Sequence, residues 1–140
     1  MKAALLIAII LGAMVTAKGA ITRDELIFSL NVALKTKNRA ALEKCFNFQG
    51  VDEKQRGALE ATLDAICLWP EQKVFISERK DRGPMELVRD GRTYTLNGDW
   101  TFQVHVHKGK LPSKGFVFPA GQLRDGQFAI LAMVPKSSTD

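Results

Sequence analysis

The sequence is poor in the residues from which enzyme and metal sites are most often built. Its 140 residues include two cysteines, two histidines and one tyrosine. It has no Gly-x-Ser-x-Gly elbow, no phosphate-binding glycine loop and no dinucleotide-binding glycine pattern. These absences leave no catalytic residue to name, and no cofactor is expected.

The two cysteines, Cys45 and Cys67, each fall on the apolar face of an expected helix. Two thiols in an oxidising compartment often pair, and closing this loop would contribute about 3 kcal/mol in the chain-entropy model. Buried free thiols are also common, and a disulfide requires Cα atoms within about 7 Å of each other. The sequence therefore leaves both a Cys45–Cys67 disulfide and two free thiols open.

His105 and His107 are the two histidines, and their spacing in a strand places both rings on one face. A carboxylate such as Asp99 would have to join them to bind a metal, and zinc sites usually need three or more protein ligands. No third ligand is fixed by the spacing. Because the two rings alternate with apolar residues, we expect two exposed histidines on the outer surface of a sheet and no metal site.

Positive charge is in modest excess and is not concentrated in one tract. The net charge is +5, and 25% of the residues are charged. A nucleic-acid-binding surface would carry clustered cations interleaved with exposed aromatic residues. An exported protein also rarely meets nucleic acid, so we expect no nucleic-acid partner.

The amino terminus has the pattern of an export signal. One lysine precedes an apolar run over Ala3–Val15, which is too short to span a bilayer comfortably but typical of a signal-peptide core. Small residues favour cleavage after Ala17, with Gly19 as the second choice. We expect a signal peptide over 1–17, a single domain over 18–140, no stable membrane span after processing, and a secreted or periplasmic product. An uncleaved amino-terminal anchor is the alternative.

Three amphipathic helices are expected in the first half of the domain. A capping box at Thr22 begins the first, which runs to about Lys35. Asn38 can cap a short second helix, and Asp52 can cap a third that ends before Pro70. Each helix is apolar on one side only, so each needs a sheet or a neighbouring helix to pack on.

The second half has the pattern of an antiparallel meander. Asp90-Gly91 and Asn97-Gly98 favour the mirror-image turns that join antiparallel strands. The expected strands cover residues 73–78, 85–89, 92–96, 99–107, 116–118 and 128–134. The fold class is therefore α+β, with about three N-terminal helices packed on a curved antiparallel sheet of five or six strands.

The last expected strand, Phe128–Val134, is apolar at every position. A strand of this kind belongs in the centre of a sheet, with cover on both faces. The helices can cover one face, and the other needs a curled sheet, a bound apolar ligand or a second copy of the chain. The expected ligand-binding residues are Trp100, Phe102, Leu131 and Met133.

Short segments resemble a known superfamily. Leu34–Leu42 looks like the helix–turn–helix opening of the cone-shaped α+β domains of the nuclear transport factor and ketosteroid isomerase superfamily. Phe118–Gly121 and Arg124–Phe128 are similar to endings of uncharacterised exported bacterial proteins. The superfamily includes isomerases, dehydratases and non-catalytic binding or dimerising modules. Its catalytic Tyr–Asp arrangement has no counterpart here, because Tyr94 is the one tyrosine and lies in an expected strand. Cystatin-like domains share the helix-on-sheet shape.

These observations together predict an exported, non-catalytic α+β module. It would bind a small apolar ligand or a protein partner, or form a homodimer, through a face of its sheet. The alternative is a small hydrolase or isomerase with its site in the cone cavity, using Asp99, Tyr94 or a histidine as base.

Overall fold

The computed structural model describes residues 20–80, 85–109 and 114–136. The expected signal peptide over 1–17 lies outside these residues. Among the described residues, no helix combines the length and the apolar character needed to cross a membrane.

In the described part of the chain, three helices come first: α2 (Arg23–Lys35), α3 (Arg39–Lys44) and α4 (Glu53–Leu68). Each begins at a polar residue whose side chain accepts a hydrogen bond from a backbone N–H in the first turn. These capping residues are Thr22, Asn38 and Asp52, and they accept from the backbone N–H groups of Glu25, Ala41 and Gln55. The three caps confirm the helix starts expected from the sequence.

The strands form two antiparallel sheets. The larger has the order β1-β4-β5-β6 and the smaller the order β2-β3-β7. Their bounds are β1 Gln72–Glu78, β2 Glu86–Arg89, β3 Arg92–Leu96, β4 Asp99–Lys108, β5 Gly115–Gln122, β6 Phe128–Ile130 and β7 Met133–Pro135. The α+β class is confirmed, and the single sheet of five or six strands is wrong. The hairpin of β2 and β3 leaves the main sheet, so β1 pairs directly with β4.

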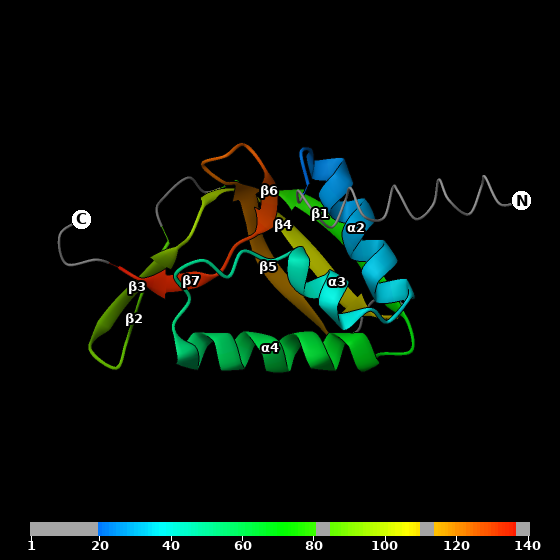
Figure 1. The fold of residues 1–140 in the computed structure, drawn as a ribbon, viewed down its shortest axis with the longest axis horizontal. Helices are drawn as coiled ribbons and strands as arrows, with labels where there is room; N and C mark the ends of the chain where they lie inside the picture. The colour runs from blue at the N-terminus through cyan, green and yellow to red at the C-terminus, as the bar shows by residue number, and fades with distance from the viewer. Residues whose placement is uncertain (1–19, 81–84, 110–113, 137–140) are drawn as a thin grey trace, which may run out of the picture.

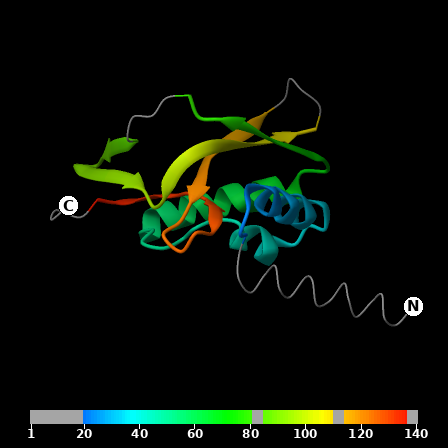
Figure 2. The ribbon, with the colours of Figure 1, turned by 90° about the horizontal axis from the view of Figure 1, so that it is seen from above.

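The helices all lie on one side of the four-stranded sheet (Figures 1 and 2). The main core fills the space between them, because the inward residues of β4 and β5 are buried with the apolar stripes of the helices. From the sheet the core takes Phe102, Val104, Val106, Phe118, Ala120 and Ile130, and from the helices Leu26, Leu30, Leu34, Leu42, Leu63 and Ile66. The molecule is thus a two-layer arrangement of helices on a sheet.

The apolar segment Phe128–Val134 is not one central strand, which corrects the expectation above. It divides into β6 and β7, which belong to different sheets. The break is set by Asn97, whose Oδ1 accepts from the backbone N–H of Ala132 at 2.9 Å and whose N–H donates to the Ala132 carbonyl at 3.0 Å. These two bonds satisfy the backbone of Ala132 and turn the chain from one sheet to the other.

The cover for this segment comes from the chain itself. On the side of β6 away from β5, Ala20 bridges to Phe128 and Phe46 to Ile130. Leu131 is buried and lies against the Asn97-Gly98 turn, where a Cβ added to Gly98 would be 2.4 Å from a Leu131 methyl group. Neither a ligand nor a second copy is therefore needed to cover Leu131.

Candidate binding face

The four residues expected to bind a ligand are not brought together. Phe102 is fully buried among the helices, with the guanidinium carbon of Arg23 4.3 Å from its ring centroid. Met133 is half-buried in the smaller sheet, and Leu131 is buried beside the Asn97-Gly98 turn. Trp100 lies on the side of the sheet opposite to Phe102. No common pocket joins them.

A β-bulge between Trp100 and Phe102 explains the position of Trp100. Trp100 is paired with Gly121, whereas Phe102 is paired with Ala120, the next residue along β5. Neighbouring residues of a strand point to opposite faces, so the bulge reverses the direction of Trp100. The sequence pattern placed Trp100 and Phe102 on one face because the bulge does not alter the alternation of apolar and polar residues in the sequence.

The side of the four-stranded sheet away from the helices is called the outer face here. Within the described residues no helix lies against it (Figure 2). The strand registers assign its members. They are Lys73, Phe75, Ser77 and Arg79 from β1 and its end, Trp100, Gln103, His105 and His107 from β4, and Val117 and Pro119 from β5.

Three parallel rings form the centre of the outer face. Phe75 is the register partner of His105, and their ring centroids are 4.5 Å apart with planes inclined by 8°. His107 continues the stack, 5.4 Å from Phe75 and 6.2 Å from His105 between centroids. Beside it, Val117 is the register partner of His105 on β5 and is 54% exposed. A stack of this kind is worth about 0.5–1.5 kcal/mol per pair beyond simple burial.

His105 is held in place by a hydroxyl group. Ser77 Oγ lies 2.8 Å from His105 Nε2, a hydrogen-bond distance. Partial burial, and then the nearby charge of His107, lower the pKa of His105 below its ordinary value of 6.5. The ring is therefore neutral at pH 7, which suits a stacked ring in a partly apolar setting. The expectation of two exposed histidines is wrong in one respect, since both rings are half-buried.

Gly115 makes room for His107. A Cβ on Gly115 would lie 2.6 Å from His107 Nδ1 and 2.8 Å from the Val106 carbonyl oxygen. The imidazole thus packs directly over the glycine on the neighbouring strand, an arrangement in which an aromatic ring covers a bare stretch of backbone.

The outward positions within β1, β4 and β5 carry Lys73 and no carboxylate, and the residues that flank β1 on the same side are Glu71 and Arg79. Lys73 is exposed on β1, and the Arg79 guanidinium carbon lies 3.8 Å from the centroid of the Trp100 ring. Trp100 Nε1 donates to the Phe102 carbonyl at 3.1 Å, which fixes the indole. Cation–π contact of this kind orients both side chains. The face is therefore aromatic at its centre and carries a net positive charge at its margin.

Three surface hollows formed by described residues do not include the stacked rings, and one of them is lined in part by Lys73 at the margin of the outer face. The largest of the three, about 830 Å³, is bounded by Asn97, Gly98, Asp99 and Leu123 among others. Two of its side chains serve the local backbone: Asn97 Oδ1 accepts from the N–H of Ala132, and Asp125 Oδ1 accepts from the N–H of Gln127. These two side chains therefore hold local turns.

Tyr94 and Asp52, far apart in the sequence, meet in the structure. The Tyr94 hydroxyl donates to Asp52 Oδ2 at 3.0 Å, and Asp52 Oδ1 accepts from the N–H of Gln55. The Gln55 N–H bond, the Tyr94 bond, Arg92 and Lys54 lower the pKa of Asp52 despite partial desolvation, so the carboxylate is ionised at neutral pH. Because both oxygens are engaged, the pair joins β3 to the start of α4.

The two cysteines are free thiols in the structure. Cys45 is buried, with Sγ 3.7 Å from the Ala41 carbonyl oxygen. Burial raises the pKa of the Cys45 thiol to about 12, so it is protonated and unreactive at neutral pH. Cys67 is half-buried on α4. Neither thiol is part of the outer face.

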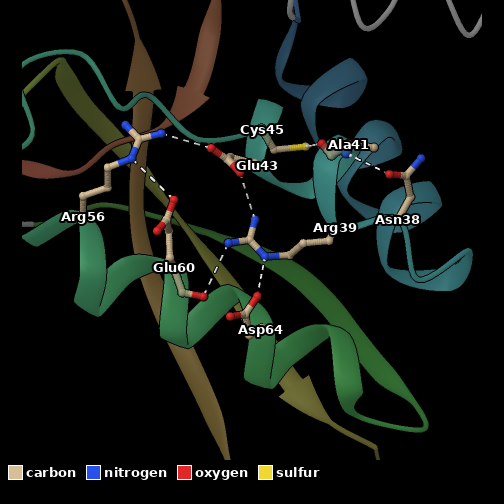
Figure 3. A network of polar contacts seen from close by, with 8 residues as sticks. All are labelled: Asn38, Arg39, Ala41, Glu43, Cys45, Arg56, Glu60 and Asp64. Carbon is tan, nitrogen blue, oxygen red and sulfur yellow. Dashed lines mark hydrogen bonds and ion pairs between the residues drawn. The ribbon is translucent and has the colours of Figure 1, made fainter.

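A charged network joins α3 to α4 on the helical side (Figure 3). Arg39 Nε lies 2.7 Å from Asp64 Oδ1, and Arg39 Nη1 lies 3.2 Å from Glu43 Oε2. Arg56 continues the network to Glu43 at 3.2 Å and to Glu60 at 3.4 Å. Every carboxylate in the network has a cationic partner, so the network fixes the short α3 against α4.

No family model, no curated protein and no solved structure matches this chain. Among the described residues, no group of three or more histidine, cysteine, aspartate or glutamate side chains is placed to hold a metal ion. The outer face is therefore the candidate site that the geometry itself supports.

Sequence reasoning missed Phe75 and Val117. Their signal was present, because Phe75 alternates with Val74 and Ile76, and Val117 lies between Phe116 and Phe118. Finding the face also required the pairing of β1 with β4, which the intervening hairpin concealed.

Proposed function

We propose that the protein is an exported, non-catalytic binding module that takes up a protein partner on its outer face. The observation that carries this proposal is the stack of Phe75, His105 and His107 on a sheet face that no described helix covers. Flat aromatic groups on a rigid sheet contribute contact area with little loss of side-chain entropy, which is why such groups are enriched in protein interfaces.

A protein partner fits this face better than a small apolar ligand. Ligand sites are concave and enclose most of the ligand, whereas the hollows described above lie away from the stacked rings. Val117, at 54% exposure, stands out from the face and does not line a cavity. A broad and nearly flat contact is the geometry of protein–protein recognition.

Charge favours a different protein over a second copy at this face. Two outer faces in contact would bring the exposed Lys73 of both chains onto the same surface. Like charges across an interface weaken it. The partner that matches the face is apolar at its centre and acidic at its margin.

Selection from a random peptide library on the immobilised protein tests this proposal. We expect the selected peptides to combine aromatic and acidic residues. Val117→Glu should weaken their binding about tenfold or more, because it places an unpaired negative charge in the contact, and Val117→Lys should weaken it less. The matched control is Val88→Glu, since Val88 is an exposed apolar residue of β2 in the smaller sheet.

Peptides that bind Val117→Glu as well as the unchanged protein would contradict the proposal. So would peptides that lose binding to Val88→Glu alone. Both outcomes can be read from folded protein, because substitutions at exposed positions usually change stability by less than about 0.5 kcal/mol.

Export belongs to the same proposal. It is supported by the apolar run Ala3–Val15 and the small residues that end at Ala17. We expect the product collected outside the cytoplasm to begin at Lys18, which amino-terminal sequencing would check. A product that keeps Met1 and stays with the membrane would show that the amino-terminal segment is an uncleaved anchor and not a signal peptide.

The resemblance to the nuclear transport factor and ketosteroid isomerase superfamily also stays a proposal. It is supported by the order of the elements, with helices before antiparallel strands. An enclosed cone cavity would take up an apolar fluorescent dye at one site per chain. If the dye titration shows no saturable uptake, the protein has no such cavity, and the alternative of a small hydrolase or isomerase is excluded with it.

A further inference from the structure

The outward side of α2 carries an apolar stripe that the described chain leaves uncovered. Phe28 is 65% exposed, Val32 44% and Ile21, just before the helix, 63%. The opposite side of the same helix is buried through Leu26, Leu30, Ala33 and Leu34. An amphipathic helix of a monomer normally has charged or polar residues where Phe28 and Val32 stand. The stripe of Ile21, Phe28 and Val32 is called the α2 stripe below.

The two ends of the α2 stripe carry opposite charges. Counted from Phe28, Ile21 is seven residues before, Asp24 four before, Val32 four after and Lys35 seven after. Spacings of four and seven place Asp24, Phe28, Val32 and Lys35 on one side of α2, and Ile21 lies just before the helix. The acid is therefore at the start of the stripe and the lysine at its end, with the apolar residues between them.

This order of residues is complementary to that of a second, identical helix running in the opposite direction. The midpoint of Phe28 and Val32 falls at residue 30, and the midpoint of Asp24 and Lys35 lies half a residue away. In an antiparallel pair of α2 helices related by a two-fold axis at that point, Phe28 of each chain meets Val32 of the other. The same operation brings Asp24 close to Lys35 of the second chain, so apolar and charged contacts share one register.

Both charges are available for such a pairing. Neither Asp24 nor Lys35 takes part in any of the ion pairs formed among the described residues. Asp24 is also not the residue that caps the helix, since Thr22 and Glu25 perform that role. A parallel pair would place Asp24 against Asp24 and Lys35 against Lys35, which is unfavourable.

We propose that the α2 stripe is the interface through which two copies of this chain associate, with their α2 helices antiparallel. This interface is separate from the outer face, so each proposal can fail without the other. A single helix pair buries less than about 1,000 Å² and makes a weak contact, with a dissociation constant of roughly 10 µM to 1 mM.

Sedimentation equilibrium of the purified full-chain product, whose amino terminus is read by mass spectrometry, tests the proposal. We expect a reversible monomer–dimer equilibrium. Phe28→Lys should lower the association constant about tenfold or more, because a largely exposed phenylalanine no longer gains burial. The control Val117→Lys also replaces an exposed apolar residue by lysine, on the outer face, and should leave the association constant unchanged.

Charge reversal tests the antiparallel register. Asp24→Lys and Lys35→Asp should each weaken self-association, because each places like charges opposite one another. Mixing the two variants should restore association, since each lysine then meets an aspartate of the other variant. Circular dichroism of each variant confirms that α2 is still formed, so a loss of association is not a loss of the helix.

Three results would overturn the proposal. The first is a monomer at every concentration, which would follow if another segment of the same chain covers the α2 stripe. The second is association that Phe28→Lys leaves intact but Val117→Lys abolishes. The third is association that neither single charge reversal weakens, which would exclude the antiparallel register.

Discussion

The two faces of the four-stranded sheet are built from the same strands and yet differ in what stabilises them. The inner face carries Phe102, Val104 and Val106, all buried under the helices. The outer face carries Phe75, His105 and His107, which are half-buried and cover one another. Residues of one sheet can therefore be shielded from water in two ways. Helices exclude water from the inner face, whereas stacked rings reduce the contact with water on the outer face and still leave their edges accessible to a partner.

Replacing one phenylalanine on each face should show the largest difference. Phe102→Ala should lower the free energy of unfolding by about 3–5 kcal/mol, because it opens a cavity in a fully packed core. Phe75→Ala removes a half-buried stacked ring and should cost about 1–2 kcal/mol. Urea denaturation followed by circular dichroism measures both. Equal losses in the free energy of unfolding would mean that burial stabilises the outer face as strongly as the inner face.

Replacement by alanine should lower the stability of the protein at the glycine of the bulge, Gly121, and raise it at the glycine inside α4, Gly57. A Cβ on Gly121 would lie 1.6 Å from the Asp99 carbonyl oxygen, and backbone cannot move aside as a side chain can. Gly121→Ala should therefore destabilise the protein by about 1–3 kcal/mol or more and shift the bulge that turns Trp100 outward. Gly57, inside α4, has nothing within 4 Å of an added Cβ.

Gly57→Ala is thus the control, and it should stabilise the protein by about 0.5–1 kcal/mol through a better helix former. Thermal unfolding of the two variants gives the sign of each change in stability directly. A neutral Gly121→Ala would show that the strands of the main sheet can slide past the bulge.

The helices could be predicted from the sequence because their signals are local. Thr22, Asn38 and Asp52 each cap a helix with a backbone N–H only three residues away, so a short stretch of sequence contains the whole interaction. The apolar spacing of the stripes then decides which side is buried. These features do not depend on how the rest of the chain folds.

The sheets could not be predicted to the same depth, because their decisive contacts join distant residues. Asn97 binds the backbone N–H of Ala132, 35 residues away, and so divides the apolar segment. Phe75 pairs with His105, from which it is separated in the sequence by the hairpin of β2 and β3. Continuous apolar character in Phe128–Val134 indicated burial but not which sheet each half would join. The outer face depends on this non-local pairing, and so no local motif indicated it.

The smallest expected effect is a pH dependence that belongs to the outer face alone. The pKa of His105 is lowered in the folded protein, first by burial and then by His107, so the unfolded chain binds a proton more readily. The stabilising contribution of the neutral ring is fully present above about pH 6.5 and is lost as the pH falls through the lowered pKa. The groups that face the ring are Phe75, Ser77, His107 and Val117.

His105→Phe keeps a stacked ring and removes the titrating group. We therefore expect this variant to lose less stability than the unchanged protein when urea denaturation is repeated between about pH 7 and pH 5. Asp52, whose pKa is also lowered from 3.8, loses its contribution only at more acidic pH, so the two groups titrate in separate windows. Partial exposure keeps the His105 effect small, because solvent screens a half-buried ring. If both proteins show the same slope in this window, proton binding at His105 does not distinguish the outer face from the inner one.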